Sequence, residues 1–278
     1  AAWDLGIRWF DTAPLYGHGE SERRLGAALA GRDRDDYTLC TKVGRVLEPG
    51  VDPDTIFRDV PDVRPRFDFS ADGIRRSLDD SLTRLGVDRV DVVHVHDPDD
   101  HLDVAIDQAY PTLVELVDED VVGSIGLGTN TIDVATRVLA EVPIGHLLLA
   151  GRITLLDRSG LDAVVPMAVE RDVEVLAAGV FNSGVLADPS PGSHFHYAPT
   201  PDAISAVVDA LRAETTTAGV SMLATAVQRP AVVPGVSRVV VGARTPREIA
   251  EDVRAAAEPV PEDLWLRLAA IADDAGLP

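Results

Sequence analysis

A strict alternation of short apolar runs and longer amphipathic segments constrains the fold of this sequence most. Seven runs rich in aliphatic residues predict strands at residues 7–11, 37–43, 90–96, 121–127, 145–150, 173–178 and 236–242. Helical spacing predicts helices at residues 20–30, 70–85, 103–117, 131–140, 159–170, 201–218 and 246–256, with an extra one at 262–275. Seven strand–helix units in this order indicate parallel strands joined by helical crossovers, as in an α/β protein.

A closed (β/α)8 TIM barrel needs one strand more than these seven. Residues 1–6 are typical of the end of a helix, so we expect a barrel that lacks its first strand in this chain. The whole of 1–278 is then a single domain with an extra C-terminal helix. An open doubly wound sheet is the alternative, but no Gly-x-Gly-x-x-Gly motif follows the first strand, and 125–130 has only part of that spacing.

The charge balance of the chain is strongly acidic, with a formal net charge of −21. This charge repels nucleic acids and anionic membranes, so neither is an expected partner. The 25 basic residues comprise 24 arginines and one lysine, Lys42. Either salt adaptation or a GC-rich genome explains such a bias. A lysine kept against it, at a predicted strand end, indicates a role that arginine cannot fill, because arginine does not lose its proton.

The cellular setting expected from the sequence is the cytoplasm. The apolar runs are too short to cross a bilayer, and no secretory leader is recognisable. The single cysteine, Cys40, excludes an internal disulfide framework.

Four residues at or just beyond predicted strand ends make a chemically coherent set: Asp11, Tyr16, Lys42 and His96. The carboxyl ends of parallel strands meet at one edge, where catalytic groups collect. An ammonium beside a tyrosine lowers its pKa, a carboxylate holds the ammonium, and a neutral histidine orients a substrate oxygen. Together they predict proton transfer between an alcohol and a carbonyl. Taken singly, each residue has an ordinary structural role as a cap, a packed ring, an exposed tether or a core imidazole.

The segment 10–26, FDTAPLYGHGESERRLG, resembles the first signature of the aldo-keto reductase family. The similarity continues through 41–44 (TKVG), 77–86 (SLDDSLTRLG) and 91–97 (DVVHVHD) and covers nearly the whole chain. The resemblance implies a (β/α)8 barrel that binds a nicotinamide cofactor, with Asp11, Lys42 and His96 supporting Tyr16 as proton donor or acceptor. Segments at 96–99, 151–157, 179–184 and 241–246 are most similar to the D-threo-aldose (L-fucose) and pyridoxal 4-dehydrogenase branch.

The same resemblance implies a cofactor site, NAD or NADP. In the family's pattern Asn130 holds the nicotinamide carboxamide, while Ala150 and Ala178 replace a glutamine and a stacking tyrosine. The remaining implied cofactor residues are Phe181, Asn182, Ser183, Gly184, Gly242, Ala243, Arg244, Thr245, Arg247, Glu248 and Asp252. Glu248 stands where an arginine commonly grips the 2′-phosphate of NADP, so NAD is favoured.

The expected activity is oxidation of an aldose at C1 to a lactone, with irregular loops at 45–68 and 181–200 selecting the substrate. Oxidation or reduction of pyridoxal or simple aldehydes is an alternative. A metal-dependent barrel hydrolase that uses His94 and His96 is a rival, although such a pair normally opens the barrel; His194 and His196 repeat the pattern in a loop. A cofactor-binding barrel without turnover is the other. No metal site is predicted, and the oligomeric state is open.

Overall fold

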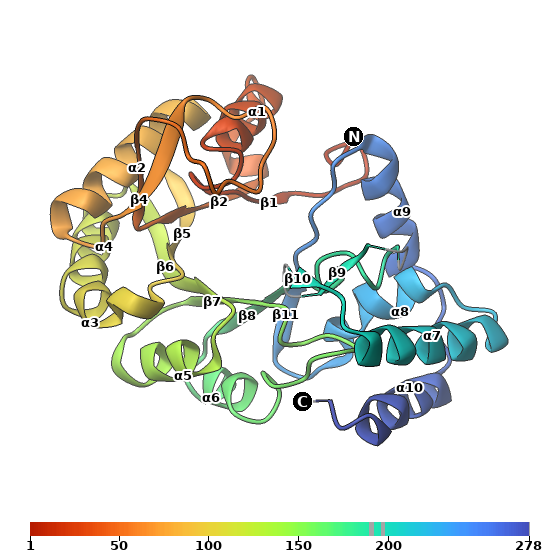
Figure 1. Cartoon of the computed structure of the whole chain (residues 1–278). Coiled ribbons are helices and arrows are strands. Elements are labelled where there is room, and N and C mark those ends of the chain that lie inside the picture. The colour runs from red at the N-terminus through yellow and green to blue at the C-terminus, as the bar shows by residue number, and fades with distance from the viewer. Residues whose placement is uncertain (189–191, 196–197, 278) are drawn as a thin grey trace. The chain divides into compact units, whose positions relative to one another are not determined.

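The computed structural model describes residues 1–188, 192–195 and 198–277, which divide into two compact units (Figure 1). The amino-terminal unit is Ile7–Leu148, and the carboxy-terminal unit is Leu149–Pro278 together with Ala1–Gly6. Residues 2–6, expected to end a helix, form turns instead, closed by the Leu5 amide on the Ala1 carbonyl at 3.1 Å.

The amino-terminal unit alternates strands and helices as predicted. Its main strands are β1 (Trp9–Asp11), β2 (Thr38–Val43), β5 (Val90–His96) and β6 (Val122–Thr129), which pair in parallel in that order. Its helices are α1 (Glu20–Leu29), α2 (Ala71–Leu85), α3 (Leu102–Val104), α4 (Tyr110–Asp118) and α5 (Ile132–Glu141). Five of the six β2 residues are buried, as expected of a parallel strand covered on both faces.

Helix α2 shows how the sequence sets its own ends. The Ser70 hydroxyl accepts a hydrogen bond from the Gly73 amide at 3.1 Å, and Gly86 ends the helix in the left-handed conformation (φ 70°). Ile74, Leu78 and Leu85 lie on its buried face. The helix predicted at 70–85 is therefore confirmed.

Two predicted elements of the amino-terminal unit differ in the structure. The helix expected at 103–117 is interrupted by a π-helical segment, Ala105–Ala109, just before Pro111, because proline supplies no amide for the regular ladder. The stretch expected to be irregular at 45–68 contains an antiparallel hairpin of β3 (Arg45–Pro49) and β4 (Val63–Phe67). A two-stranded hairpin has free outer edges, so Pro65 is tolerated there.

The strand β7 (His146–Ala150) contains the boundary between the two units. The carboxy-terminal unit holds the parallel pair β8 (Glu174–Ala178) and β11 (Val236–Val239) and a small antiparallel pair, β9 (His194–Phe195) and β10 (Ala198–Pro199). Its helices are α6 (Val164–Glu170), α7 (Asp202–Thr217), α8 (Met222–Gln228), α9 (Pro246–Ala256) and α10 (Glu262–Asp274).

Helix α6 begins five residues later than predicted. Upstream, the Thr154 hydroxyl accepts from the Leu156 and Asp157 amides, and Asp157 accepts from the Ser159 amide and hydroxyl. These local bonds give the backbone an alternative to the helix. Helix α8 was not predicted. It packs in an apolar cluster that includes Leu211, Ala224 and Leu264.

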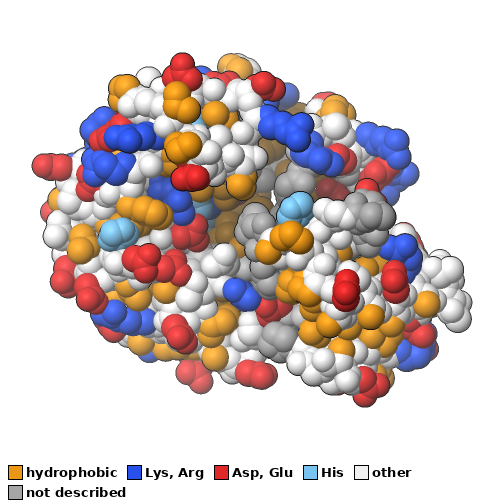
Figure 2. Space-filling model, viewed as in Figure 1, with side chains coloured by type: hydrophobic (Ala, Val, Ile, Leu, Met, Phe, Trp, Pro, Cys, Tyr) orange, Lys and Arg blue, Asp and Glu red, His pale blue; other side chains and the backbone are white. Residues whose placement is uncertain are grey.

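Acidic and arginine side chains are interspersed on the surface shown in Figure 2. Many are paired, such as Arg75 with Glu115 and Glu119. Among the residues that the structure describes, no helix is long and apolar enough to span a membrane.

Candidate active site

The four predicted catalytic residues lie in the amino-terminal unit, and the structure brings them together. Asp11 is the last residue of β1, and His96 is the last residue of β5. Lys42 is the next-to-last residue of β2, which lies between those strands, and its side chain is 1% exposed. Its ammonium donates to Asp11 Oδ2 at 2.5 Å and to the Thr12 carbonyl at 2.9 Å.

Tyr16 lies in the turn after β1 and contacts Lys42 and His96. The Lys42 Nζ is 4.7 Å from the centre of its ring, and the His96 ring meets it edge-on at 5.9 Å and 89°. The Ser21 amide donates to the Tyr16 carbonyl at 3.2 Å, which ties the turn to α1. The phenol therefore stands between the only lysine and a histidine.

The charge of Lys42 is secured although it is buried. Burial disfavours the ammonium, but Asp11 and Tyr16 together outweigh this cost and raise the pKa of Lys42. Burial also pushes the pKa of Asp11 upward, against the effect of Lys42. We take the pair as ionised, because an ammonium held at 2.5 Å is itself the strongest stabilisation that the carboxylate receives.

The sequence predicts that Lys42 lowers the pKa of Tyr16, and the structure corrects this expectation. Burial raises this pKa above its usual value, and the lowering effect of Lys42 is real but smaller. Asp11 and Asp97 also raise it by charge repulsion. At neutral pH Tyr16 is therefore a phenol. The pKa of His96 lies well below its usual value because of burial and the Lys42 charge, so the imidazole is neutral, as predicted.

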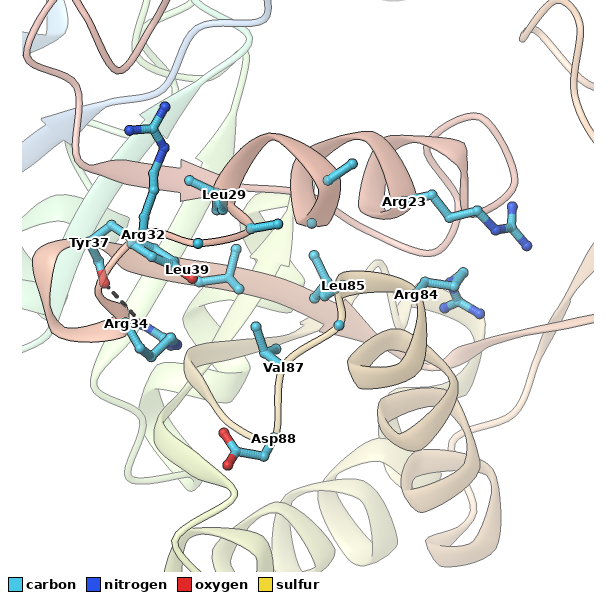
Figure 3. Close-up of a pocket in the computed structure, with 15 residues that line it drawn as sticks. Arg23, Leu29, Arg32, Arg34, Tyr37, Leu39, Arg84, Leu85, Val87 and Asp88 are labelled. Atoms are coloured by element: carbon cyan, nitrogen blue, oxygen red, sulfur yellow. Dashed lines mark hydrogen bonds between the residues drawn. The ribbon is translucent and has the colours of Figure 1, made fainter.

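A separate cavity of the same unit has a different character (Figure 3). It measures about 850 Å³ and lies where α1 and α2 end and β2 begins, so it adjoins the strand end opposite Lys42. Its arginines have partners within the protein: Arg34 donates to the Tyr37 carbonyl at 3.0 Å and to Asp91 at 2.7 Å, and Arg84 donates to Glu22 at 2.6 Å. None of the predicted site residues lines it.

Most of the predicted cofactor residues gather around one cavity of the carboxy-terminal unit, about 820 Å³ in volume. It lies at the start of α9, where Thr245 caps the helix. Gly242 borders open space, since among the described residues no atom beyond its two chain neighbours lies within 4 Å of the position that a Cβ would take there. The predicted residues that line it are Phe181, Ser183, Gly184, Gly242, Arg244, Thr245, Arg247, Glu248 and Asp252. A glycine followed by a helix start suits an anionic phosphate.

Three predicted cofactor residues do not line this cavity. Asn182 is 2% exposed, and its side-chain amide has no hydrogen-bond partner among the described residues. Ala243 is exposed in the loop before α9. Asn130 belongs to the amino-terminal unit, where it follows β6 and its Oδ1 accepts from Thr131 Oγ1 at 3.3 Å.

Both arginines at the start of α9 are paired with carboxylates of the same helix. Glu248 accepts from the Arg244 amide at 2.6 Å and from its guanidinium at 3.1 Å. Arg247 donates to Glu251 at 2.7 Å. Each of these two guanidinium groups therefore has an acidic partner at this end of the cavity.

Comparison with known proteins decides the family. The family model described as "Aldo/keto reductase family" matches residues 1–273. The chain belongs to the aldo/keto reductase family. Its relatives include D-threo-aldose 1-dehydrogenase of a Pseudomonas species, 39% identical over 97% of this chain and 85% of the relative. Pyridoxal 4-dehydrogenase of Microbacterium luteolum is 34% identical over 96% of this chain and 85% of its own length.

Solved structures of the same family confirm the predicted α/β barrel type. An aldo-keto reductase, AKR11C1 from Bacillus halodurans in its holo form, superposes with a TM-score of 0.79 at 26% identity. The match covers 98% of this aldo-keto reductase and 84% of that chain. The protein is therefore an oxidoreductase of a family that uses NAD(P)H.

The chain's own residues fit such a cofactor. The cavity lies at the start of α9, and the buried side-chain amide of Asn182, which lies in sequence between the lining residues Phe181 and Ser183, has no hydrogen-bond partner among the described residues. Buried polar groups without partners are uncommon, and a ligand is one way to satisfy them.

The structure of this aldo-keto reductase also shows site contacts that the sequence did not reveal. His18 Nε2 lies 3.1 Å from Thr55 Oγ1 and 3.3 Å from Asp52 Oδ2, which connects the loop after β3 to the turn that holds Tyr16. Asp97 pairs with Arg45 at 2.9 Å beside His96. The sequence carried a signal only for the contact at Asp97, in the run from His96 to Asp99.

The metal reading finds no support in the described residues, where no three His, Cys, Asp or Glu side chains gather to hold an ion. His94 is fully buried with Nδ1 3.9 Å from Asp11 Oδ1, and His96 faces Tyr16. His194 lines the cavity at the start of α9, and His196 lies outside the described residues.

Proposed function

We propose that this aldo-keto reductase oxidises a small aldose at its anomeric carbon to a lactone, with NAD as the oxidant. The observation that carries the proposal is the buried Lys42 ammonium, bound to Asp11 at 2.5 Å and 4.7 Å from the Tyr16 ring. The name of the relative at 39% identity, D-threo-aldose 1-dehydrogenase, supports an aldose as substrate.

Each residue of the site has a role in moving one proton. The bound nicotinamide supplies the hydride acceptor. As the anomeric C–H bond breaks and its electron pair leaves with the hydrogen, the hydroxyl proton passes to the Tyr16 phenolate oxygen and a C=O bond forms. Lys42 stabilises that phenolate, Asp11 holds Lys42 in place, and the neutral imidazole of His96 orients the substrate oxygen.

The preference for NAD rests on the pairing at the start of α9. The Glu248 carboxylate accepts hydrogen bonds from both the backbone amide and the guanidinium of Arg244, and Arg247 is paired with Glu251. A 2′-phosphate would meet the Glu248 charge and would have to compete for these arginines. A free ribose hydroxyl can instead donate to the carboxylate.

The test is a screen of the purified protein against aldoses, pyridoxal and simple aldehydes, with NAD or NADP at fixed salt. The reaction is monitored by the change in nicotinamide absorbance. We expect an aldose with NAD to give the highest kcat/KM. Pyridoxal belongs in the screen because a relative at 34% identity is named pyridoxal 4-dehydrogenase. The substrate proposal is wrong if only pyridoxal or aldehydes react, and the cofactor proposal is wrong if NADP is as efficient as NAD.

A further inference from the structure

Asp97 directly follows His96 and is held in an uncommon backbone conformation. Its φ is 44°, in the left-handed region that side chains other than Gly, Asn and Asp rarely adopt. Its amide donates to the Gly128 carbonyl at 2.9 Å. The carboxylate is about one-third exposed, with Oδ2 3.5 Å from His96 Nε2. The backbone therefore places a carboxylate next to the imidazole that is proposed to orient the substrate oxygen.

Arg45, the first residue of β3, completes a pair with this carboxylate. Its Nη2 lies 2.9 Å from Asp97 Oδ2, and its guanidinium carbon lies 4.4 Å from the centre of the Phe67 ring. Its Nε is buried and has no partner among the described residues. A partly exposed ion pair adds little stability, so stability alone gives weak reason to hold Asp97 in this conformation.

We propose that Asp97 and Arg45 bind the hydroxyl group on C2 of the aldose, next to the reacting carbon. This inference rests on the proposed aldose oxidation. Asp97 is a specificity-determining residue whose carboxylate accepts a hydrogen bond from the C2 hydroxyl. Arg45 orients Asp97 and donates a hydrogen bond to a neighbouring sugar oxygen.

The chemistry of the two groups sets which side of the sugar faces them. An ionised carboxylate only accepts hydrogen bonds, and a guanidinium only donates them. In a ring-form aldose, the anomeric carbon is bonded to the ring oxygen, which has no hydrogen, and to C2, which carries a hydroxyl. Only the C2 side can donate to Asp97. Vicinal oxygens lie about one hydrogen-bond length apart, so an oxygen on His96 Nε2 brings the next one within reach of Asp97.

The experiment compares one aldose with its 2-deoxy analogue, using the aldose and cofactor that give the best turnover. Hydrogen bonds to charged groups contribute enough that we expect the wild-type kcat/KM to favour the parent aldose by about 10- to 100-fold. Asp97→Gly removes the carboxylate and suits the positive φ, so we expect the two substrates to become nearly equal. Asp97→Asn keeps an accepting oxygen and should give an intermediate ratio.

Asp100→Asn is the matched control, since Asp100 is exposed three residues further along and should keep the wild-type ratio. Thermal unfolding of each variant verifies that it is folded. The inference is overturned if wild type uses both sugars equally or if Asp97→Gly retains the wild-type ratio while aldoses are oxidised. If wild type oxidises no aldose at all, the proposed function fails first and this inference fails with it.

Discussion

At the scale of single residues, burial determines the chemistry of the site as much as proximity does. Lys42 is close enough to Tyr16 to stabilise a phenolate, yet the pKa of Tyr16 is raised because desolvation is the larger effect. The phenol form therefore dominates at neutral pH. It is ready to donate a proton, which is the role needed for reduction of a carbonyl, whereas oxidation requires the phenolate.

The raised pKa predicts opposite pH profiles for the two directions. Below the pKa of Tyr16, whose reference value is 10.0, the phenolate fraction grows about tenfold with each pH unit. We expect kcat/KM for oxidation to rise steadily between pH 7 and about 9.5 and kcat/KM for reduction to stay nearly level. Initial rates in both directions, in buffers of constant ionic strength, measure this.

Tyr16→Phe is the control for the assignment. It keeps the ring beside Lys42 and His96 but removes the hydroxyl, so turnover should fall by about 10²- to 10⁴-fold and any residual rate should lose the pH slope. Cofactor affinity, followed by fluorescence titration, should be almost unchanged. A level oxidation profile in wild type, or full activity of Tyr16→Phe, would contradict the role of Tyr16.

At the scale of elements, the packing of α1 on α2 supports the strand that carries Lys42. Glu22 of α1 is completely buried and accepts from Arg84 of α2 at 2.6 Å and from Thr41 of β2 at 2.7 Å. Thr41 directly precedes Lys42. Gly26 of α1 allows the close approach, since a Cβ there would lie 2.2 Å from the Leu85 carbonyl oxygen.

Gly26→Ala should therefore destabilise the protein, although alanine is the better helix former. Helix propensity favours alanine by about 1 kcal/mol, but moving α2 away from backbone contact costs more, and we expect a net loss of about 1–3 kcal/mol. Urea unfolding followed by circular dichroism measures it. Ala27→Ser, at an exposed position of the same helix, should change stability by less than about 1 kcal/mol. Equal stability of Gly26→Ala and wild type would refute the close-packing argument.

At the scale of the whole molecule, the net charge of −21 opposes folding. Ion pairs such as Arg75 with Glu115 and Arg267 with Glu214 neutralise part of the surface charge. Acidic and basic side chains are interspersed on the face shown in Figure 2. The excess of acidic groups leaves a net repulsion that acts over the Debye length, about 10 Å at 0.1 M salt and about 3 Å at 1 M.

Screening this repulsion should stabilise the protein. We expect Tm to rise when NaCl is increased from 0.1 M to 1 M, because relief of the net repulsion exceeds the loss from exposed ion pairs, each worth at most about 1 kcal/mol. Differential scanning calorimetry measures the change. KCl at the same concentrations should act equally if screening is the cause. A fall in Tm with either salt would show that the surface ion pairs dominate.

Local sequence pattern and tertiary contacts determine different parts of this structure. The alternation of strands and helices and the strand ends that carry Asp11, Lys42 and His96 depend on residues a few positions apart, so the sequence alone determined them. The hairpin at 45–68 was missed because its proline and glycine content is also that of an irregular loop.

Only the tertiary structure decided the contacts between distant segments and the effects of burial. Asp97 and Arg45 are 52 residues apart, and Arg84 and Glu22 are 62 apart, separations at which no periodicity reports a contact. The direction of the Tyr16 pKa likewise depends on how much water the fold removes, which a sequence does not state. The sequence by itself determined the four groups of the candidate catalytic site, and the fold decided their protonation, because desolvation is a property of packing.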